Sequence, residues 1–391
     1  MGRLEYLLSS AWLRLLALVM RLPLPFFRPR PRVVLASPRV ARIEGNLAYL
    51  QRALRLQRPE LDCVLLPEPY GYGLRAKLAY LLRVTRGLYY LHTSRVFVVD
   101  NAYLPVHVAP HPPTTTVVQV WHAASAVKRF GMDTATPPAE PERTFLHRFY
   151  DHVIVSSEAV RAPYSRALRT PPEQVLPLGT PRTDFFFDEP AMAAARQRLL
   201  ATHPQLAGRR VVLYAPTFRG RGRGKHAAAG LDAAQLRAAL PTDHALVLKT
   251  HPNLDPTLTP RDGYDVVADH TDEINDWLAL ADIFITDYSS SIFEWALLRR
   301  PLILMVGDLA DYEREPGMYV DYRTEMAGVQ VTTTDEVIAA IRNRSFDTAG
   351  YDALIERHVG ACDGRSSERV AAHVLSLLDD RTPPWARDED G

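Results

Sequence analysis

The chain has 391 residues, of which 47% are hydrophobic and 23% charged, and its formal net charge is +1 at pH 7. A single hydrophobic core rarely grows beyond roughly 250 to 300 residues, so this length predicts two domains, and the composition is that of a globular chain. The small net charge excludes a dedicated nucleic-acid binder, which needs many uncompensated Lys and Arg side chains.

The first segment, residues 1–42, is apolar and basic, with Glu5 as its one acid. Its longest apolar run is broken by arginines and prolines and is far shorter than the ~20 residues that span a bilayer. Residues 4–20 instead predict an amphipathic helix lying in a membrane interface, so we expect residues 1–31 to form a membrane-associating segment. The alternative is an ordinary packed helix with a solvated basic face.

Residues 70–99 strengthen the membrane interpretation, because they contain no acid while basic side chains alternate with leucines and tyrosines. Such a mixture suits an anionic inner leaflet, where each Lys or Arg adds about 1 kcal/mol. Taken together, the two stretches favour a peripheral membrane protein.

The next part of the chain alternates short apolar runs with helical stretches, a pattern typical of βα units around a parallel sheet. Residues 46–56 have helical spacing, and a proline-rich connector spans residues 176–190. We expect a first α/β domain over residues 32–187. The predicted strands are residues 33–36, 63–66, 96–99, 116–120 and 152–155.

A second α/β series fills residues 188–391, with predicted helices at 272–281 and 291–298. The closing helices, 334–341 and 368–378, are expected to pack on this second sheet. The predicted strands are residues 210–216, 245–249, 264–267, 282–286 and 301–305. Two facing α/β domains would place an active site in the cleft between them, at the carboxyl ends of the strands.

The turn at residues 287–291, Asp-Tyr-Ser-Ser-Ser, lies between a predicted strand and a predicted helix. Unsatisfied N–H groups at a helix start, joined by serine hydroxyls, suit a diphosphate. A capping box of Ser291 and Glu294 would explain the same residues without a ligand, and spacing alone does not separate the two.

His122 follows the predicted strand 116–120, with Lys128 and Arg129 close behind. A histidine at this edge can take a proton from a hydroxyl group near pH 7, although a structural histidine is the plainer alternative.

Two further strand ends carry cations. Lys249 and His251 could neutralise or protonate a leaving phosphate, and Arg219 could grip a phosphate with both guanidinium nitrogens. Each of these turns would otherwise be a plain loop exposed to solvent.

No Asp-x-Asp or histidine-rich cluster indicates a metal, and the two cysteines, Cys63 and Cys362, form neither a Cys-x-x-Cys pair nor a disulfide framework. We therefore expect no metal, no cofactor and a reducing compartment.

Several motifs in one order resemble the CDP-glycerol glycerophosphotransferases of wall teichoic acid synthesis. They are Trp121-His122, residues 128–131 (Lys-Arg-Phe-Gly), 179–184 (Gly-Thr-Pro-Arg-Thr-Asp), 214–219 (Tyr-Ala-Pro-Thr-Phe-Arg), 249–252 (Lys-Thr-His-Pro), 287–294 (Asp-Tyr-Ser-Ser-Ser-Ile-Phe-Glu) and 315–322 (Glu-Pro-Gly-Met-Tyr-Val-Asp-Tyr). The resemblance implies a GT-B fold, with two facing Rossmann-like domains and a central cleft. It also implies transfer of glycerol phosphate from CDP-glycerol, or ribitol phosphate from CDP-ribitol, to an undecaprenyl-diphosphate-linked disaccharide at the cytoplasmic face of the bacterial membrane, with release of CMP.

The resemblance also assigns roles to residues. His122 would be the catalytic base and His251 a second catalytic residue, with Trp121, Asp184, Asp287 and Ser291 supporting the site. The implied donor-binding residues are Arg182, Pro216, Thr217, Arg219, Lys249, Thr250, Ser289, Ser290 and Glu294. Glu294 stands where the family commonly has Asp.

The residues after His122 point to one branch of the family. Polymerases usually continue as Trp-His-Gly-Thr-Pro, whereas this chain continues as Ala123-Ala124-Ser125, which looks like the primases that add the first unit. A polymerase, a GT-B nucleotide-sugar glycosyltransferase or epimerase, and a non-catalytic membrane scaffold remain as alternatives. The sequence leaves a homo-oligomer open.

Overall fold

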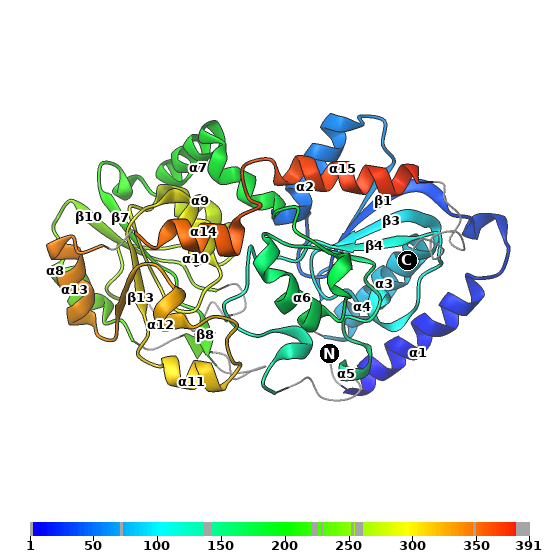
Figure 1. Ribbon diagram of the computed structural model, residues 1–391, viewed down its shortest axis with the longest axis horizontal. Coiled ribbons are helices and arrows are strands. Elements are labelled where there is room, and N and C mark those ends of the chain that lie inside the picture. Colours follow the sequence, from blue (N-terminus) through cyan, green and yellow to red (C-terminus); the bar gives the residue numbers. More distant parts are fainter. Residues whose placement is uncertain are drawn as a thin grey trace. The chain divides into compact units, whose positions relative to one another are not determined.

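The computed structural model describes residues 3–70, 73–136, 142–219, 226–227, 230–251, 254, 261–346 and 349–380. These residues form two compact units, each built on a six-stranded parallel sheet (Figure 1). Unit 1 takes in Met1–Ala124, Arg129–Asp184 and Val359–Gly391, and unit 2 takes in Ser125–Lys128 and Phe185–His358. The predicted α/β class with two Rossmann-like domains is confirmed.

The sheet of unit 1 has the order β2-β1-β3-β4-β5-β6. Its central strands are runs of β-branched residues buried on both faces, which is the pattern of a parallel sheet. Val33 of β1 pairs with Cys63 on one side and Val96 on the other. The strands are β1 (Arg30–Ser37), β2 (Cys63–Pro67), β3 (Ser94–Val99), β4 (Thr116–Gln119), β5 (His152–Ile154) and β6 (Val175–Leu176).

Helices cover both faces of this sheet, and in Figure 1 α2 lies beside α15 at the upper face while α3 and α4 lie below. The helices are α1 (Arg3–Val19), α2 (Gly45–Gln57), α3 (Leu74–Thr93), α4 (Leu104–Val108), α5 (Glu142–Phe145), α6 (Arg161–Leu168) and α15 (Ser366–Asp379). Short 3-10 turns are η1 (Pro25–Phe27), η2 (Gly131–Asp133), η3 (Glu158–Val160), η4 (Pro172–Gln174) and η5 (Pro181–Phe187).

The last helix differs from the sequence expectation, since residues 368–378 do not pack on the second sheet. Val370, Val374 and Leu378 of α15 lie in the core of unit 1 with Leu50 and Val96. Its amphipathic pattern gives α15 an apolar stripe but does not say which core receives it. The stripe fits the space beside α2, so the chain returns to unit 1 after residue 358.

Helix α1 is also part of unit 1 and not a separate appended segment. Leu13 and Ala17 are buried against the neighbouring helices, and Trp12 donates through Nε1 to Thr85 of α3 at 3.1 Å. Arg14 donates to the carbonyl of Val108 and lies 3.8 Å above the ring of Phe145. Among the described helices, none is both long and apolar enough to cross a bilayer.

The sheet of unit 2 has the order β11-β10-β7-β12-β13-β14, again parallel throughout. Its strands are β7 (Arg210–Tyr214), β10 (His244–Leu248), β11 (Val266–Val267), β12 (Ile283–Thr286), β13 (Leu302–Met305) and β14 (Val329–Val331), with a separate ribbon of β8 (Phe218–Arg219) and β9 (His226–Ala227). Its helices are α7 (Glu189–Thr202), η6 (Pro204–Leu206), α8 (Ala233–Ala239), α9 (Ile274–Leu280), α10 (Ser291–Leu298), α11 (Leu309–Arg314), α12 (Tyr322–Glu325), α13 (Thr334–Asn343) and α14 (Tyr351–Val359).

The strand order of unit 2 reverses between β7 and β12, because the chain runs from β7 outward to β10 and β11 and then returns to β12. Parallel α/β sheets bind ligands at such a switch point, outside the carboxyl ends of the strands. The loops after β7 and β12 therefore occupy the position where a ligand of unit 2 is expected.

Unit 1 contains a buried carboxyl group that titrates near neutrality. Glu68, which follows β2, is 2% exposed and accepts a hydrogen bond from the hydroxyl of Tyr103. Burial raises the pKa of Glu68 to about 7, although Tyr103 and the charges of Arg86 and Arg83 oppose the shift. Gly87 is required beside this pair, since a Cβ there would meet the Tyr103 hydroxyl.

Stability should therefore depend on the charge of Glu68. The folded chain holds a proton there that the unfolded chain loses near pH 4.5, so this group lowers stability as the pH rises from about 4.5 to about 7. In urea unfolding, Glu68→Gln should gain up to about 3 kcal/mol on the wild type between pH 4.5 and pH 8. Exposed Glu60→Gln is the control, and an equal pH response of both variants would contradict the assignment.

Candidate active site

In unit 1 the chain turns sharply after β4, at Trp121 and His122. Trp121 has a φ of 48°, in the left-handed region that residues other than glycine rarely adopt. Its N–H donates to Gln119 Oε1 at 2.8 Å and its carbonyl accepts from Asn46 Nδ2 at 2.8 Å. Backbone strain of this kind persists only where the surroundings enforce it, and it concentrates at functional sites.

The ring of His122 is half-buried and lies 4.6 Å from that of Trp121, which stacks on Phe130 at 5.1 Å. Two other histidines behind Trp121 are structural. His107 and His147 are buried and share the hydroxyl of Tyr150 at 2.9 and 3.1 Å, and burial lowers the pKa of His107 to about 3. Burial therefore holds these two histidines neutral.

Asn46 joins the predicted residues of unit 1, and sequence reasoning did not single it out. It is 3% exposed, donates to the carbonyls of Val120 and Trp121, and accepts from the N–H of Arg182 at 3.0 Å. One amide thus ties the His122 turn to the Arg182 turn. An asparagine in the first turn of a predicted helix was the available signal, but it is equally common as a local cap.

Asp184 has a structural task that was not expected of a donor site. Its two carboxylate oxygens accept from the N–H groups of Ser366 and Ser367 at 2.9 and 2.7 Å. It therefore caps the start of α15, whose own N-cap residue, Arg365, supplies no side-chain cap. Gly179 makes room for this contact, since a Cβ there would lie 2.3 Å from Ser366 Oγ.

At the switch point of unit 2, Asp287 joins the loops after β7 and β12. Its carboxylate accepts from the N–H and the hydroxyl of Thr217 at 2.8 and 2.9 Å. Arg219 pairs with the same carboxylate at 2.9 Å and with Asp308 at 2.6 Å. Burial disfavours the guanidinium charge, but Asp308 and Asp287 outweigh it and raise the pKa of Arg219. Arg219 therefore braces the loops through two carboxylates, and its predicted contact with a phosphate stays a prediction.

Three tyrosines complete this brace. Tyr288 donates to Asp308 at 2.9 Å, and its ring lies 4.1 Å from that of Tyr312. Tyr322 is fully buried and donates to the carbonyl of Asp287. Tyr322 closes the motif 315–322, to which the sequence alone assigned no role.

The serine turn that follows Asp287 is arranged differently from the predicted capping box. Helix α10 begins at Ser291, and Ser289 Oγ accepts from the N–H of Ser291 at 3.2 Å. Glu294 is fully buried one turn into the helix, so the box of Ser291 and Glu294 is wrong. A capping box does form on α13, from Thr333 and Glu336. Ser289 and Ser290 remain half-buried at the start of α10.

The strand β10 leads into Lys249, Thr250 and His251. Lys249 is 3% exposed, and its ammonium donates to the carbonyls of Asp269 and His270 at 3.0 and 3.1 Å. Burial lowers its pKa. The predicted neutralising charge is thus already held by backbone carbonyls. His251 is half-buried, with its ring 4.9 Å from that of Phe218, while Pro252 lies outside the described residues.

A cavity of about 290 Å³ opens beside these loops, wholly within unit 2. Two of the predicted donor-binding residues, Pro216 and Thr250, line it, together with Tyr214, Leu231, Asp232, Ala233, Ala234, Leu248, Asp262 and Tyr264. Burial raises the pKa of Tyr264 to about 12, so its phenol stays neutral and donates hydrogen bonds. The cavity offers apolar walls and a few polar groups, as small-molecule sites do.

The short segment Ser125–Lys128 belongs to unit 2 although His122 belongs to unit 1. Val127 accepts from the N–H of Tyr319 at 2.9 Å, and Lys128 forms an antiparallel bridge with Met318. The Lys128 ammonium lies 5.6 Å from the ring centroid of Phe218 and 5.8 Å from that of Tyr312. Across the described residues it makes neither a hydrogen bond nor an ion pair, unlike Arg219 and Lys249.

The predicted residues therefore gather in two sets. Unit 1 brings together Trp121, His122 and Arg182, and unit 2 brings together Pro216, Thr217, Arg219, Lys249, Thr250, His251, Asp287, Ser289, Ser290, Ser291 and Glu294. No group of three or more His, Cys, Asp or Glu side chains in the described part of the chain could hold a metal ion.

Comparison with known proteins identifies relatives along nearly the whole chain. A family model described as CDP-glycerol:poly(glycerophosphate) glycerophosphotransferase matches residues 18–376. The teichoic acid ribitol-phosphate primase of Bacillus spizizenii is 34% identical over 357 residues, which is 89% of this chain and 91% of that protein. The teichoic acid glycerol-phosphate primase of Bacillus subtilis is 25% identical over 342 residues, covering 85% of each chain.

Among solved structures, the wall teichoic acid polymerase TagF resembles the chain with a TM-score of 0.73 and 18% identity, covering 93% of this chain and 92% of that one. This likeness concerns the fold, and it confirms the GT-B type.

The cap formed by Asp184 can be separated from a role in donor binding. Asp184→Ala should lower the free energy of unfolding by about 1–2 kcal/mol, because two N–H groups of α15 lose their acceptor. Asp184→Asn keeps an acceptor oxygen and should lose less. The KM for the donor should stay within twofold in both variants. An increased KM in a variant of unchanged stability would show instead that Asp184 contacts the donor.

Proposed function

The chain belongs to the CDP-glycerol:poly(glycerophosphate) glycerophosphotransferase family, which includes teichoic acid primases, and on that premise we propose that it transfers one polyol phosphate from a CDP-linked polyol to a lipid-linked disaccharide, releasing CMP. The observation that carries the proposal is the pairing of Thr217 with Asp287 across the switch point of unit 2. This pairing fixes two of the predicted donor-binding loops where α/β sheets bind ligands.

Single addition is favoured over polymerisation, because the chain covers 91% and 85% of two primases. The second question is whether the polyol is glycerol or ribitol. The expected donor, CDP-glycerol, stays a prediction, while the 34% identity to a ribitol-phosphate primase, against 25% to a glycerol-phosphate primase, favours CDP-ribitol.

We place the nucleoside of the donor in the cavity beside Pro216 and Thr250, with the diphosphate toward the start of α10. The N–H groups at a helix start and the hydroxyls of Ser289 and Ser290 suit an anion there. Glu294 and His251 remain proposed donor contacts from the family resemblance.

Lys128 is our candidate for the charge that neutralises the leaving CMP. Arg219 forms ion pairs with Asp287 and Asp308, and the ammonium of Lys249 donates to backbone carbonyls. The N–H groups of both side chains are therefore already bonded within the protein. The ammonium of Lys128 lies over the rings of Phe218 and Tyr312 and forms neither a hydrogen bond nor an ion pair with any described residue, which leaves its three N–H groups for phosphate oxygens.

The proposed chemistry is an in-line displacement at phosphorus. His122 accepts the proton of the acceptor hydroxyl, the hydroxyl oxygen attacks the polyol-bearing phosphorus, and the bond to the CMP oxygen breaks as CMP leaves. Such transfers require mainly positioning and charge stabilisation. The strained turn at Trp121 and the amide of Asn46 would hold His122 in place for this step.

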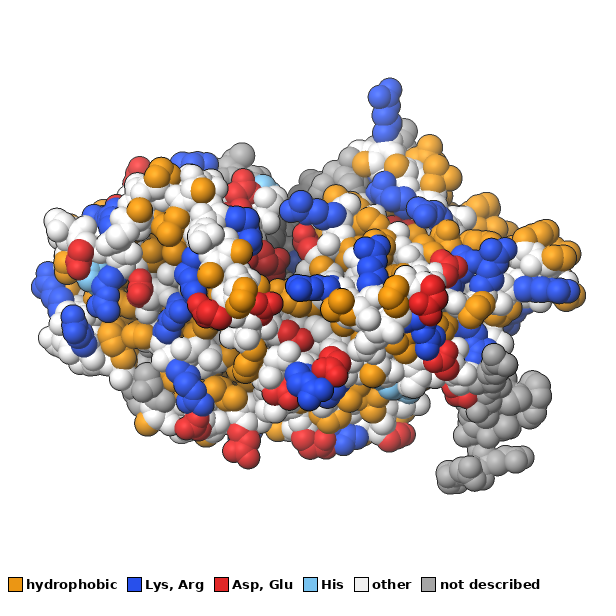
Figure 2. Space-filling view, turned by 90° about the horizontal axis from the view of Figure 1, so that it is seen from above, with side chains coloured by type: hydrophobic (Ala, Val, Ile, Leu, Met, Phe, Trp, Pro, Cys, Tyr) orange, Lys and Arg blue, Asp and Glu red, His pale blue; other side chains and the backbone are white. Residues whose placement is uncertain are grey.

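The proposed acceptor lies in the membrane, and unit 1 has a surface that suits the cytoplasmic face. The outer side of α1 is apolar, with Leu8, Leu15 and Leu18 each more than half exposed, and Leu78 and Leu82 of α3 are exposed too. Figure 2 shows hydrophobic and basic side chains interleaved at the end of the molecule where α1 lies. We propose that this face inserts shallowly into an anionic inner leaflet.

Donor choice tests the proposed activity. The protein is incubated with CDP-ribitol or CDP-glycerol and a short-chain lipid-linked disaccharide, and the product is weighed by mass spectrometry. We expect one polyol phosphate per acceptor, CMP release, faster turnover with CDP-ribitol, and no loss of rate in EDTA. Release of UDP or GDP from a nucleotide sugar, with neither CDP-polyol used, would overturn the proposal in favour of a glycosyltransferase.

The base assigned to unit 1 is tested in the same assay. His122→Ala should lower kcat by about 10²–10⁴-fold, the usual contribution of a general base. His111→Ala is the matched control, because His111 precedes β4 at the other edge of the same sheet. Equal activity of both variants would rule out His122 as the base.

The role of Lys128 predicts a loss without unfolding. Lys128→Ala should lower kcat/KM for the donor by about 10–100-fold, as expected for a charge-assisted contact of roughly 1.5–3 kcal/mol. Lys128→Arg should recover part of the loss, and the exposed neighbour variant Arg129→Ala should remain near wild type. An unchanged kcat/KM in Lys128→Ala would show that Lys128 does not neutralise the leaving CMP and that another cation does so.

Membrane binding is measured by sedimentation with vesicles. Leu8→Glu combined with Leu15→Glu should reduce binding to anionic vesicles at least tenfold, because both side chains lie on the outer face of α1. The control is Leu56→Glu, since Leu56 is 75% exposed on α2. Deleting residues 1–31 would be a poor test because Leu13 and Ala17 belong to the core of unit 1. Equal binding by the double variant and the control would exclude this face.

A further inference from the structure

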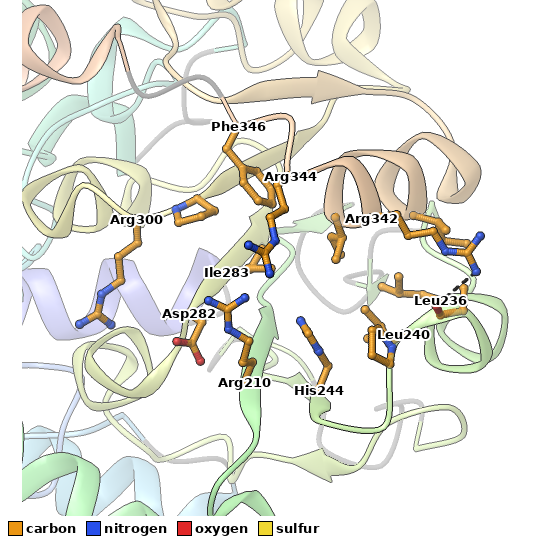
Figure 3. A pocket seen from close by; sticks show the side chains of 15 residues that line it. Arg210, Leu236, Leu240, His244, Asp282, Ile283, Arg300, Arg342, Arg344 and Phe346 are labelled. Carbon is orange, nitrogen blue, oxygen red and sulfur yellow. Dashed lines mark hydrogen bonds between the residues drawn. The ribbon is translucent and has the colours of Figure 1, made fainter.

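A second cavity, of about 540 Å³, lies at the other edge of the sheet of unit 2 (Figure 3). Arg210 and His244, which line it, are the first residues of β7 and β10, whereas the candidate donor site follows the last residues of these strands. Both strands are five residues long, so at about 3.3 Å per residue the two edges lie roughly 15 Å apart. None of the predicted donor-binding residues lines this cavity.

The floor of the cavity is apolar and continues the core of unit 2. It is made of Leu236 of α8 and Leu240 just after it, Ile283 of β12, Ile338 and Ile341 of α13, and Phe346. The volume falls within the roughly 300–1,000 Å³ of small-molecule sites. An apolar or aromatic group of a ligand could therefore be buried here.

The rim is basic, with four arginines and His244 against one carboxylate, that of Asp282. Three of these groups are already engaged. Asp282 accepts from the N–H of Val211 at 2.8 Å, Arg300 donates to the carbonyl of Ala281 at 2.7 Å, and His244 bonds Asp243 at 2.7 Å.

The remaining arginines are less constrained. Arg342 donates to the carbonyl of Ala239 at 3.3 Å, while Arg210 and Arg344 form no side-chain hydrogen bond or ion pair with any described residue. Figure 3 shows the guanidinium groups of Arg210 and Arg344 turned toward one another in the middle of the cavity. Two like charges over an apolar floor are relieved by an anion between them, and guanidinium groups bind phosphate with two parallel hydrogen bonds.

We propose that this cavity binds a phosphate-bearing small molecule with an apolar or aromatic body. The phosphate lies between Arg210 and Arg344, and the body lies against Leu240, Ile283 and Phe346. Two sources share this chemistry: a nucleoside monophosphate and an isoprenoid phosphate. The site is separate from the proposed donor site, and the proposal does not depend on the transferase assignment.

Calorimetric titration of the full chain tests the site, with farnesyl phosphate, CMP and inorganic phosphate as probes. Farnesyl phosphate or CMP should bind at least tenfold more tightly than inorganic phosphate, and whichever does so identifies the source. Arg210→Ala combined with Arg344→Ala should weaken that binding at least tenfold. Arg198→Ala, which removes an exposed arginine of α7 that pairs with Asp276, should leave it unchanged.

A second variant separates the cavity from general charge effects and from CMP bound at the donor site. Ile338→Trp keeps every arginine but fills the floor, and it should weaken the same binding at least tenfold while transferase turnover stays within twofold. Binding that survives both the arginine variant and Ile338→Trp would overturn the proposal. So would the failure of both organic probes to bind more tightly than inorganic phosphate.

Discussion

The carboxylate of Asp287 is the interaction on which the candidate donor site depends. It accepts two hydrogen bonds from Thr217 and an ion pair from Arg219, and its own backbone carbonyl is held by Tyr322. These contacts join the loops after β7 and β12, the two strands that flank the switch point. Because the carboxylate is buried and fully engaged, it fixes loop geometry and is not itself available to a ligand.

The cationic side chains near this site also have partners within the protein. A buried cation is tolerated only when it is paired or hydrogen-bonded, and Arg219 and Lys249 meet that condition with carboxylates and carbonyls of the protein. These partners satisfy both cations within the protein, where they hold the loops at the edge of the sheet. Lys128 is different, because its ammonium lies over the rings of Phe218 and Tyr312 and forms neither a hydrogen bond nor an ion pair with a described residue. In the proposed function, Arg219 and Lys249 therefore hold the loops, and Lys128 is the cation that contacts the substrate.

In unit 1, buried side chains likewise support the turn that carries His122. His107 and His147 are buried, share the hydroxyl of Tyr150 and are neutral, whereas His122 sits half-buried on a strained turn. The amide of Asn46 holds that turn to the Arg182 turn through three backbone groups. Each unit therefore prepares its own half of the proposed chemistry. The four residues Ser125–Lys128 belong to unit 2, although the chain on both sides of them belongs to unit 1.

The sequence by itself determined the α/β class, the strands of both large sheets except β6 and β14, and the positions of His122 and residues 287–291, because hydrophobic periodicity and strand-end motifs are local signals. The family motifs added the proposed reaction. Only the tertiary structure decided that α15 returns to unit 1, that Asp184 caps it, and that Arg219 and Lys249 have partners within the protein. Those outcomes depend on which groups meet across 20 to about 320 residues of chain. A sequence pattern records a residue's capacity to donate, accept or pack, but not the partner that the fold supplies.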